Sequence, residues 1–194
     1  MLKGWIKSKT TDRYLRPLRE QLISMIEPGT SIVEFGCGTG DLLFRASSQI
    51  QRGKGFDSSK SLIAFAKEKK RSSSVDNLEF ICADIGKHDF LMERFDYGIA
   101  SLFIHALPKV NRKQVLGKLS NISGKILIAD FIPPGSFKER CWLHIDEMTT
   151  GHYQHYLTYC REDGMIGLSK QCGLTVMDQM HTFDPVINIF LMQK

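Results

Sequence analysis

Three glycines at alternate positions follow an acid at the end of an apolar run. The segment SIVEFGCGTGDLL contains Glu34 and then Gly36, Gly38 and Gly40. Glycine contributes no side-chain packing and adds conformational entropy to the unfolded chain. A turn built of glycines is therefore typical of a place where a ligand or another backbone segment approaches closely. The ligand that such a turn accepts depends on the charges around it.

Two further acids end later apolar segments. Asp57 ends GKGFD, and Asp84 follows FICA. In an open α/β sheet, ligands bind outside the carboxyl ends of the strands. Together with Glu34, these acids put negative charge at three successive strand ends, on the rim where a ligand would lie. Such a rim favours a cationic ligand.

The phosphate-binding patterns fit this segment poorly. The chain has no Gly-x-x-x-x-Gly-Lys-Ser/Thr segment for a nucleoside triphosphate. A dinucleotide site is closer, because Asp57 follows the glycines at about the expected 20 residues. However, the third glycine falls one place early, and Asp41 at the expected helix N-terminus would repel a pyrophosphate.

A nucleoside that carries a sulfonium and an amino acid, and no phosphate, fits these charges better. Glu34 can neutralise its ammonium group. Asp57 can accept hydrogen bonds from both ribose hydroxyls, and Asp84 can accept one from the adenine amino group.

The same segments resemble the successive motifs of class I S-adenosylmethionine-dependent methyltransferases. They are VEFGCGTG, GKGFDSS, FICADI and FDYGIASLFIHAL, within residues 30–131. The resemblance implies S-adenosyl-L-methionine as the cofactor and a seven-stranded sheet with an antiparallel last strand. It also implies these cofactor-binding residues: Glu34, Gly36, Gly38, Gly40, Asp57, Ser58, Asp84, Ile85, Ser101 and Leu102. Of these, Ser101 and Leu102 would line the methionine end.

His105 is the candidate general base. The sulfonium is already a good electrophile, so the enzyme has to hold a nucleophile in line with the S–CH3 bond and remove its proton where it carries one. Histidine suits proton removal near neutral pH. His105 follows the fourth predicted strand in ASLFIHAL, beside the expected methyl position. The alternative is a histidine that only packs against the cofactor or the core.

The aromatic segment HYQHYLTYC gives the candidate substrate pocket, with His152, Tyr153 and Tyr156 as lining residues. On a helix, the spacing of three puts Tyr153 and Tyr156 on one face. Such a face predicts a wall for an aromatic or cationic substrate, and the alternative is a partly buried amphipathic helix. His152 and His155 with Cys160 make no complete ligand set, so no metal is predicted. The segment around it is faintly similar to the methyltransferases of quinone biosynthesis.

Alternating apolar runs and helical segments must position these residues. Strands are predicted at residues 31–35, 54–57, 78–83, 97–102, 125–131, 174–183 and 186–192. Helices are predicted at residues 15–26, 41–50, 59–70, 111–120, 137–148 and 162–172. This order predicts an α/β fold, a Rossmann-like doubly wound sheet of about seven strands, mostly parallel with an antiparallel edge strand, and helices on both faces.

The chain is expected to form a single methyltransferase domain. Residues 1–29 would form a helical lid, residues 30–131 the cofactor-binding core, and residues 132–194 the substrate-side helices and closing strands. Of the 194 residues, 42% are hydrophobic and 24% are charged, which is ordinary for a globular protein. Five cysteines without Cys-x-x-Cys spacing predict reduced thiols in a cytoplasmic protein. Neither a secretory signal nor a membrane span is expected.

The function predicted from these features is in-line methyl transfer from S-adenosylmethionine to a small molecule. The net charge of +5 is mild, and six early basic residues are expected to form a solvated helix face: Lys3, Lys7, Lys9, Arg13, Arg16 and Arg19. An RNA or protein substrate drawn by these charges is the alternative. A nicotinamide-dependent oxidoreductase and a non-catalytic cofactor-binding module are less favoured.

Overall fold

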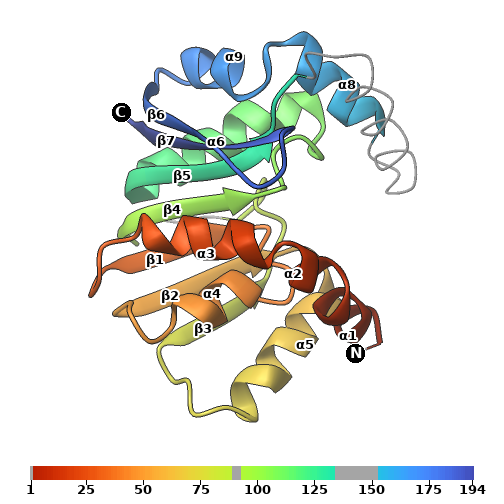
Figure 1. Ribbon diagram of the computed structural model, residues 1–194, viewed down its shortest axis with the longest axis vertical. Helices are drawn as coiled ribbons and strands as arrows, with labels where there is room; N and C mark the ends of the chain where they lie inside the picture. The colour runs from red at the N-terminus through yellow and green to blue at the C-terminus, as the bar shows by residue number, and fades with distance from the viewer. Residues whose placement is uncertain (1, 89–92, 134–152) are drawn as a thin grey trace.

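A seven-stranded mixed sheet forms the centre of the molecule. The computed structural model describes residues 2–88, 93–133 and 153–194 (Figure 1). The strands are β1 (Ser31–Phe35), β2 (Arg52–Asp57), β3 (Leu78–Cys82), β4 (Phe95–Ser101), β5 (Ser123–Phe131), β6 (Thr175–His181) and β7 (Ile187–Gln193). They lie in the order β3-β2-β1-β4-β5-β7-β6. Strands β1 to β5 are parallel, and β7 is antiparallel to both β5 and β6, which confirms the predicted fold class.

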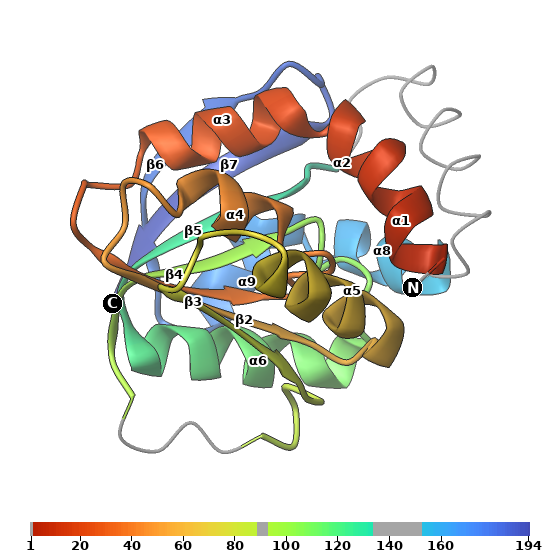
Figure 2. The ribbon, with the colours of Figure 1, turned by 90° about the horizontal axis from the view of Figure 1, so that it is seen from below.

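Helices cover both faces of this sheet. They are α1 (Leu2–Lys9), α2 (Thr11–Tyr14), α3 (Arg16–Ser24), α4 (Asp41–Ala46), α5 (Lys60–Arg71), α6 (Lys109–Ile122), α8 (Tyr153–Arg161) and α9 (Gly164–Gln171). Figure 2 shows α3 and α4 on one side of the sheet and α6 on the other. No helix in the described ranges combines the length and apolar character needed to cross a membrane.

Burial explains why these segments form these elements. Every residue of β1 is buried, as expected for a central parallel strand that is covered on both faces. In α3 and its flanks, the predicted apolar stripe of Leu15, Leu18, Leu22 and Ile26 is buried. Pro17 lies in the first turn of α3, where its missing N–H costs nothing. The core therefore fixes the strand ends that carry the candidate site.

The first two helices were not individually predicted, although a helical N-terminal region was expected. Helix α1 packs on α5, where Gly4 contacts Phe65, a tertiary contact with no local sequence signal. The expected helix at residues 41–50 ends earlier, at Ala46. The expected helix at residues 137–148 lies outside the described residues. Helix α8 contains most of the aromatic segment, as its helical interpretation required.

Candidate functional site

The glycine turn lies between β1 and α4 and is held by β2. The backbone N–H groups of Gly36 and Cys37 donate to the carbonyl of Phe56, at 2.8 and 3.1 Å. All three glycines have positive φ, and the φ of Gly38 is 56°. An L side chain at this position would be strained, so the turn requires glycine here. The turn consequently presents bare backbone at the carboxyl end of β1.

Asp57 ties the end of β2 to this turn. One carboxylate oxygen accepts from the N–H of Gly38 at 2.9 Å, and the other accepts from the N–H of Ser59 at 2.8 Å. Each carboxylate oxygen can accept a second hydrogen bond. The half-buried Asp57 is thus oriented by the backbone, with acceptor capacity left for two neighbouring hydroxyl groups.

The residues expected around the adenine lie at the neighbouring strand end. Asp84 follows β3, and its carboxylate accepts from the N–H of Gly86 at 3.0 Å within its own loop. The Asp84 side chain is 56% exposed and has Lys87 at 3.7 Å, so it remains accessible to a ligand. Ile85 is buried. Ser58 is exposed, and its carbonyl accepts from the Cys82 thiol at 3.7 Å.

Glu34 differs from these acids because it is fully enclosed. Its side chain lies at the carboxyl end of β1 and the residue is 2% exposed. Within the described part of the chain, its Oε2 atom has no hydrogen-bonding partner. Burial raises the pKa of the Glu34 carboxyl to about 7, with Arg19 and Lys7 opposing the shift and Asp41 and Asp12 adding to it. An unsatisfied buried carboxyl is destabilising unless a ligand supplies donors.

The end of β4 brings in the next two expected cofactor residues. Ser101 is buried, and its hydroxyl has no partner among the residues that the structure describes. Leu102 has a φ of 50°, an uncommon conformation for a branched residue that costs roughly 1 kcal/mol or more. The conformation is held by a hydrogen bond from the Leu102 N–H to the carbonyl of Ala129, at 2.8 Å. Backbone strain of this kind is concentrated at functional sites.

His105 is buried and paired with Asp130, which lies near the end of β5. The ring Nδ1 is 2.5 Å from one oxygen of Asp130. The other Asp130 oxygen accepts from the N–H groups of Ile104 and His105, at 3.0 and 3.1 Å. Because an ionised carboxylate only accepts hydrogen bonds, this geometry puts the ring proton on Nδ1 and makes Nε2 the basic nitrogen. Asp130 thus fixes both the position and the tautomer of His105.

Aromatic rings surround this pair. The ring centroid of His105 is 4.7 Å from that of Phe131 and 6.5 Å from that of Tyr159, both edge-on. The Tyr156 ring packs edge-on against Phe131 at 5.7 Å and is buried. Of the three expected pocket residues, Tyr156 therefore packs on the ring that contacts the candidate base, Tyr153 is the first residue of α8, and His152 lies outside the described residues.

Arg112 of α6 attaches α8 to this side of the sheet. Its guanidinium donates to the carbonyl of His155 and, at 3.0 Å, to the hydroxyl of Thr158. It also lies 3.4 Å from Glu162 and over the Tyr159 ring. Arg112 is 1% exposed, so its guanidinium is buried between α6 and α8, whereas its hydrogen-bonding partners are partly exposed.

Several polar residues of this region were missed or misjudged from the sequence. Asp130 has a local signal, because it is an acid inside the apolar run KILIADF. Arg19 also has one, since it falls within the apolar stripe of α3, three places before Leu22. Instead of forming part of a solvated face, Arg19 is 7% exposed. Asp12 is buried as well, and it accepts a 2.5 Å hydrogen bond from Thr39 of the glycine turn.

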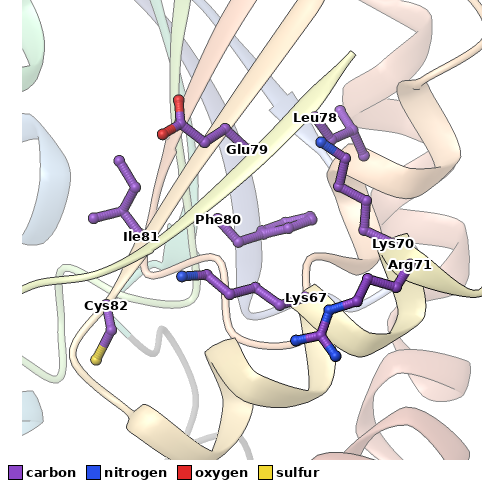
Figure 3. A pocket seen from close by; sticks show the side chains of 8 residues that line it. All are labelled: Lys67, Lys70, Arg71, Leu78, Glu79, Phe80, Ile81 and Cys82. Atoms are coloured by element: carbon purple, nitrogen blue, oxygen red, sulfur yellow. The ribbon is translucent and has the colours of Figure 1, made fainter. Parts of the chain in front are cut away.

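A surface groove of about 590 Å³ lies elsewhere, between α5 and the edge strand β3 (Figure 3). Its lining includes the basic residues Lys67, Lys70 and Arg71, and it extends along β3 to Cys82. None of the expected cofactor residues lines it. Among the described residues, no group of three His, Cys, Asp or Glu side chains could hold a metal ion.

Known proteins are similar to this chain in sequence family and in fold. A family model described as a methyltransferase domain matches residues 26–157. No curated protein sequence gives a significant match. The fold is similar to a putative methyltransferase from Bacillus halodurans C-125, with a TM-score of 0.68 and 13% identity over 84% of this chain and 71% of that one. It is also similar to magnesium protoporphyrin IX methyltransferase from Synechocystis PCC 6803 with bound SAH, with a TM-score of 0.68 and 14% identity over 95% and 83% of the two chains.

A third structure has the same fold. It is an O-methyltransferase family 2 protein from Planctomyces limnophilus DSM 3776 in complex with apigenin, with a TM-score of 0.65 and 16% identity over 86% of this chain and 51% of that one. The family match covers well over half of the chain and includes the glycine turn, the strand-end acids and His105. The chain therefore belongs to the methyltransferase-domain family, the class I S-adenosylmethionine-dependent enzymes whose motifs it resembles and whose fold it has.

Proposed function

We propose that this protein transfers a methyl group from S-adenosylmethionine to a small molecule. The observation that carries the proposal is the set of three acids at successive strand ends around a glycine turn, one of them a buried carboxyl with an unpartnered oxygen. A sulfonium nucleoside supplies the positive charge and the donors that this rim lacks. Structures with this fold include a magnesium protoporphyrin IX methyltransferase and an O-methyltransferase family 2 protein in complex with apigenin, which supports the same substrate class.

Each acid has a distinct role in holding the cofactor. Asp57 accepts from the two ribose hydroxyls while it keeps its bonds to the Gly38 and Ser59 N–H groups. Asp84 accepts from the adenine amino group, beside the apolar Ile85. Glu34 accepts from the ammonium of the methionine arm, which lies on the bare backbone of the glycine turn. Ser101 and Leu102 border the methionine end, towards the acceptor.

The acceptor binds on the side of β4, β5 and α8. Its nucleophilic atom attacks the methyl carbon, the C–S bond breaks, and the electron pair goes to sulfur, which becomes a neutral thioether. Nε2 of His105 takes the proton of the nucleophile, and Asp130 stabilises the imidazolium that forms. The aromatic rings of Phe131, Tyr156 and Tyr159 keep this region apolar and exclude water.

A macromolecular substrate is the second candidate. The basic groove along α5 and the charged N-terminal helices favour an anionic partner such as RNA. Binding to nucleic acid would weaken steeply with added salt, whereas binding of a neutral small molecule would not.

The decisive experiment follows methyl transfer from labelled S-adenosylmethionine into separate pools of metabolites, RNA and protein. We expect label in the metabolite pool, and none when His105→Ala protein is used. Label only in RNA or protein would refute the small-molecule assignment. Calorimetry with S-adenosylhomocysteine and with NAD tests the class of the enzyme, because only the former should bind.

A further inference from the structure

Five charged residues from five elements lie near the glycine turn. They are Lys7 of α1, Asp12 of α2, Arg19 of α3, Glu34 of β1 and Asp41 of α4, and the other four all act electrostatically on Glu34. Three are acids and two are bases, so the cluster carries one net negative charge when all are ionised. Of the five, only Glu34 lies within the VEFGCGTG motif.

Two of the five side chains have a direct hydrogen-bonding or ion-pair partner. Asp12 accepts from the hydroxyl of Thr39, and Asp41 pairs with Arg45 at 2.8 Å. The remaining charges are Lys7, Arg19 and Glu34. Among the ion pairs within 4.0 Å that the described residues form, none involves these three side chains.

Arg19 and Glu34 are both enclosed and both incompletely bonded. Arg19 is 7% exposed and Glu34 is 2% exposed. Over the described ranges, Nε and Nη1 of Arg19 and Oε2 of Glu34 have no hydrogen-bonding partner. The ion pairs between described residues do not include a direct Arg19–Glu34 contact within 4.0 Å. Two opposite buried charges that do not satisfy each other cost stability, unless a group with both donors and acceptors lies between them.

Lys7 adds a second cation beside the turn. Its Nζ atom lies 2.5 Å from the point where a Cβ atom on Gly38 would be. Helix α1 is fixed there because Gly4, one turn before Lys7 on the same face, packs on Phe65 of α5. The ammonium of Lys7 is therefore held against the bare backbone on which the methionine arm of the cofactor would lie.

We propose that Lys7 and Arg19 bind the carboxylate of the cofactor's amino-acid end, while Glu34 binds its ammonium. The inference rests on the proposed function. An amino-acid zwitterion supplies an acceptor for the two cations and a donor for the acid, so one ligand provides a partner for each of the three charges. The zwitterion adds no net charge, and the nearby sulfonium balances the negative charge left in the cluster. Helices α1 and α3 are then parts of the cofactor site.

The test compares two ligands that differ only in the carboxylate. These are S-adenosylhomocysteine and its decarboxylated analogue, 5′-(3-aminopropylthio)adenosine, both measured by titration calorimetry. Wild-type protein should bind S-adenosylhomocysteine at least tenfold more tightly than the analogue. Lys7→Met and Arg19→Met should each weaken S-adenosylhomocysteine about tenfold to a hundredfold, as expected for a lost charge-assisted hydrogen bond, and should leave the analogue within about twofold.

Matched controls remove a charge from the exposed side of the same helices. Lys9→Met in α1 and Arg16→Met in α3 should leave both affinities unchanged. If the buried Arg19 variant does not fold, Lys7→Met decides the question alone. A wild-type preference that neither variant reduces would overturn the inference and leave the proposed function intact. Failure of wild-type protein to bind S-adenosylhomocysteine would overturn both.

Discussion

Glu34→Gln should make the ligand-free protein more stable at alkaline pH. The Glu34 carboxyl has a pKa raised from 4.5 to about 7, chiefly by burial. Below pH 4.5 the carboxyl is protonated in the folded and in the unfolded chain, so it adds no pH dependence. Between pH 4.5 and 7 the unfolded chain releases the proton and the folded chain keeps it. Stability therefore falls as the pH rises through this window, and the full loss remains above pH 7.

The size of the effect follows from the shift. One pKa unit corresponds to about 1.36 kcal/mol, so the rise from 4.5 to about 7 destabilises the ionised wild-type protein by about 3 kcal/mol. Glutamine has nearly the same shape and no charge to bury. At pH 8 the variant should thus gain up to about 3 kcal/mol, or about 6–12 °C in Tm for a chain of this length. At pH 5 the two proteins should have similar stability.

Urea unfolding followed by circular dichroism at pH 5, 6, 7 and 8 measures this difference. Glu68→Gln is a suitable control, because Glu68 is a surface residue of α5 that pairs with Arg71, and its loss should change stability by less than about 0.5 kcal/mol. The same Glu34→Gln variant should bind S-adenosylhomocysteine more weakly than wild type. If Glu34→Gln is no more stable than wild type at pH 8, or if its gain in stability is the same at pH 5, Glu34 is not a buried carboxyl that is ionised at a cost in the ligand-free protein.

Three further substitutions test other parts of the site. Asp57→Ala should weaken the binding of S-adenosylhomocysteine by about 1.5–3 kcal/mol in calorimetry, whereas the control Asp76→Ala, at an exposed position, should leave it unchanged. Equal affinities of the two variants would count against the assignment of Asp57 to the ribose. Gly38→Ala and Gly29→Ala should both lose roughly 1 kcal/mol of stability in urea, because both positions have positive φ. Only Gly38→Ala should weaken cofactor binding, and a normal affinity of this variant would speak against a close approach of the cofactor to the glycine turn. Asp130→Asn reverses the hydrogen bond to Nδ1 and should lower kcat roughly 100-fold with unchanged affinity for S-adenosylhomocysteine, and unaltered turnover would remove the histidine pair from catalysis.

The local sequence determined the strands, the glycine turn and the acids that follow the strands. Apolar periodicity reports burial of a segment, and parallel strands place their carboxyl ends on one edge, so the sequence alone assigns Glu34, Asp57 and Asp84 to one rim. The stripe of α3 was predicted for the same reason. The paired closing strands were also predicted, although their spatial order, with β7 between β5 and β6, follows only from the sheet.

Only the tertiary structure decided which charges share a buried space. Lys7 and Arg19 belong to helices whose basic residues resemble a solvated face. Arg19 falls within the apolar stripe of α3, but neither residue has a local signal for the charges that it meets. They come close enough to act electrostatically on Glu34 because α1 packs on α5 and α3 packs on α4. Asp130 likewise lies 25 residues from His105 and meets it only because β4 and β5 are neighbours in the sheet. Periodicity reports whether a side chain is buried, whereas the partner that it meets there depends on long-range packing.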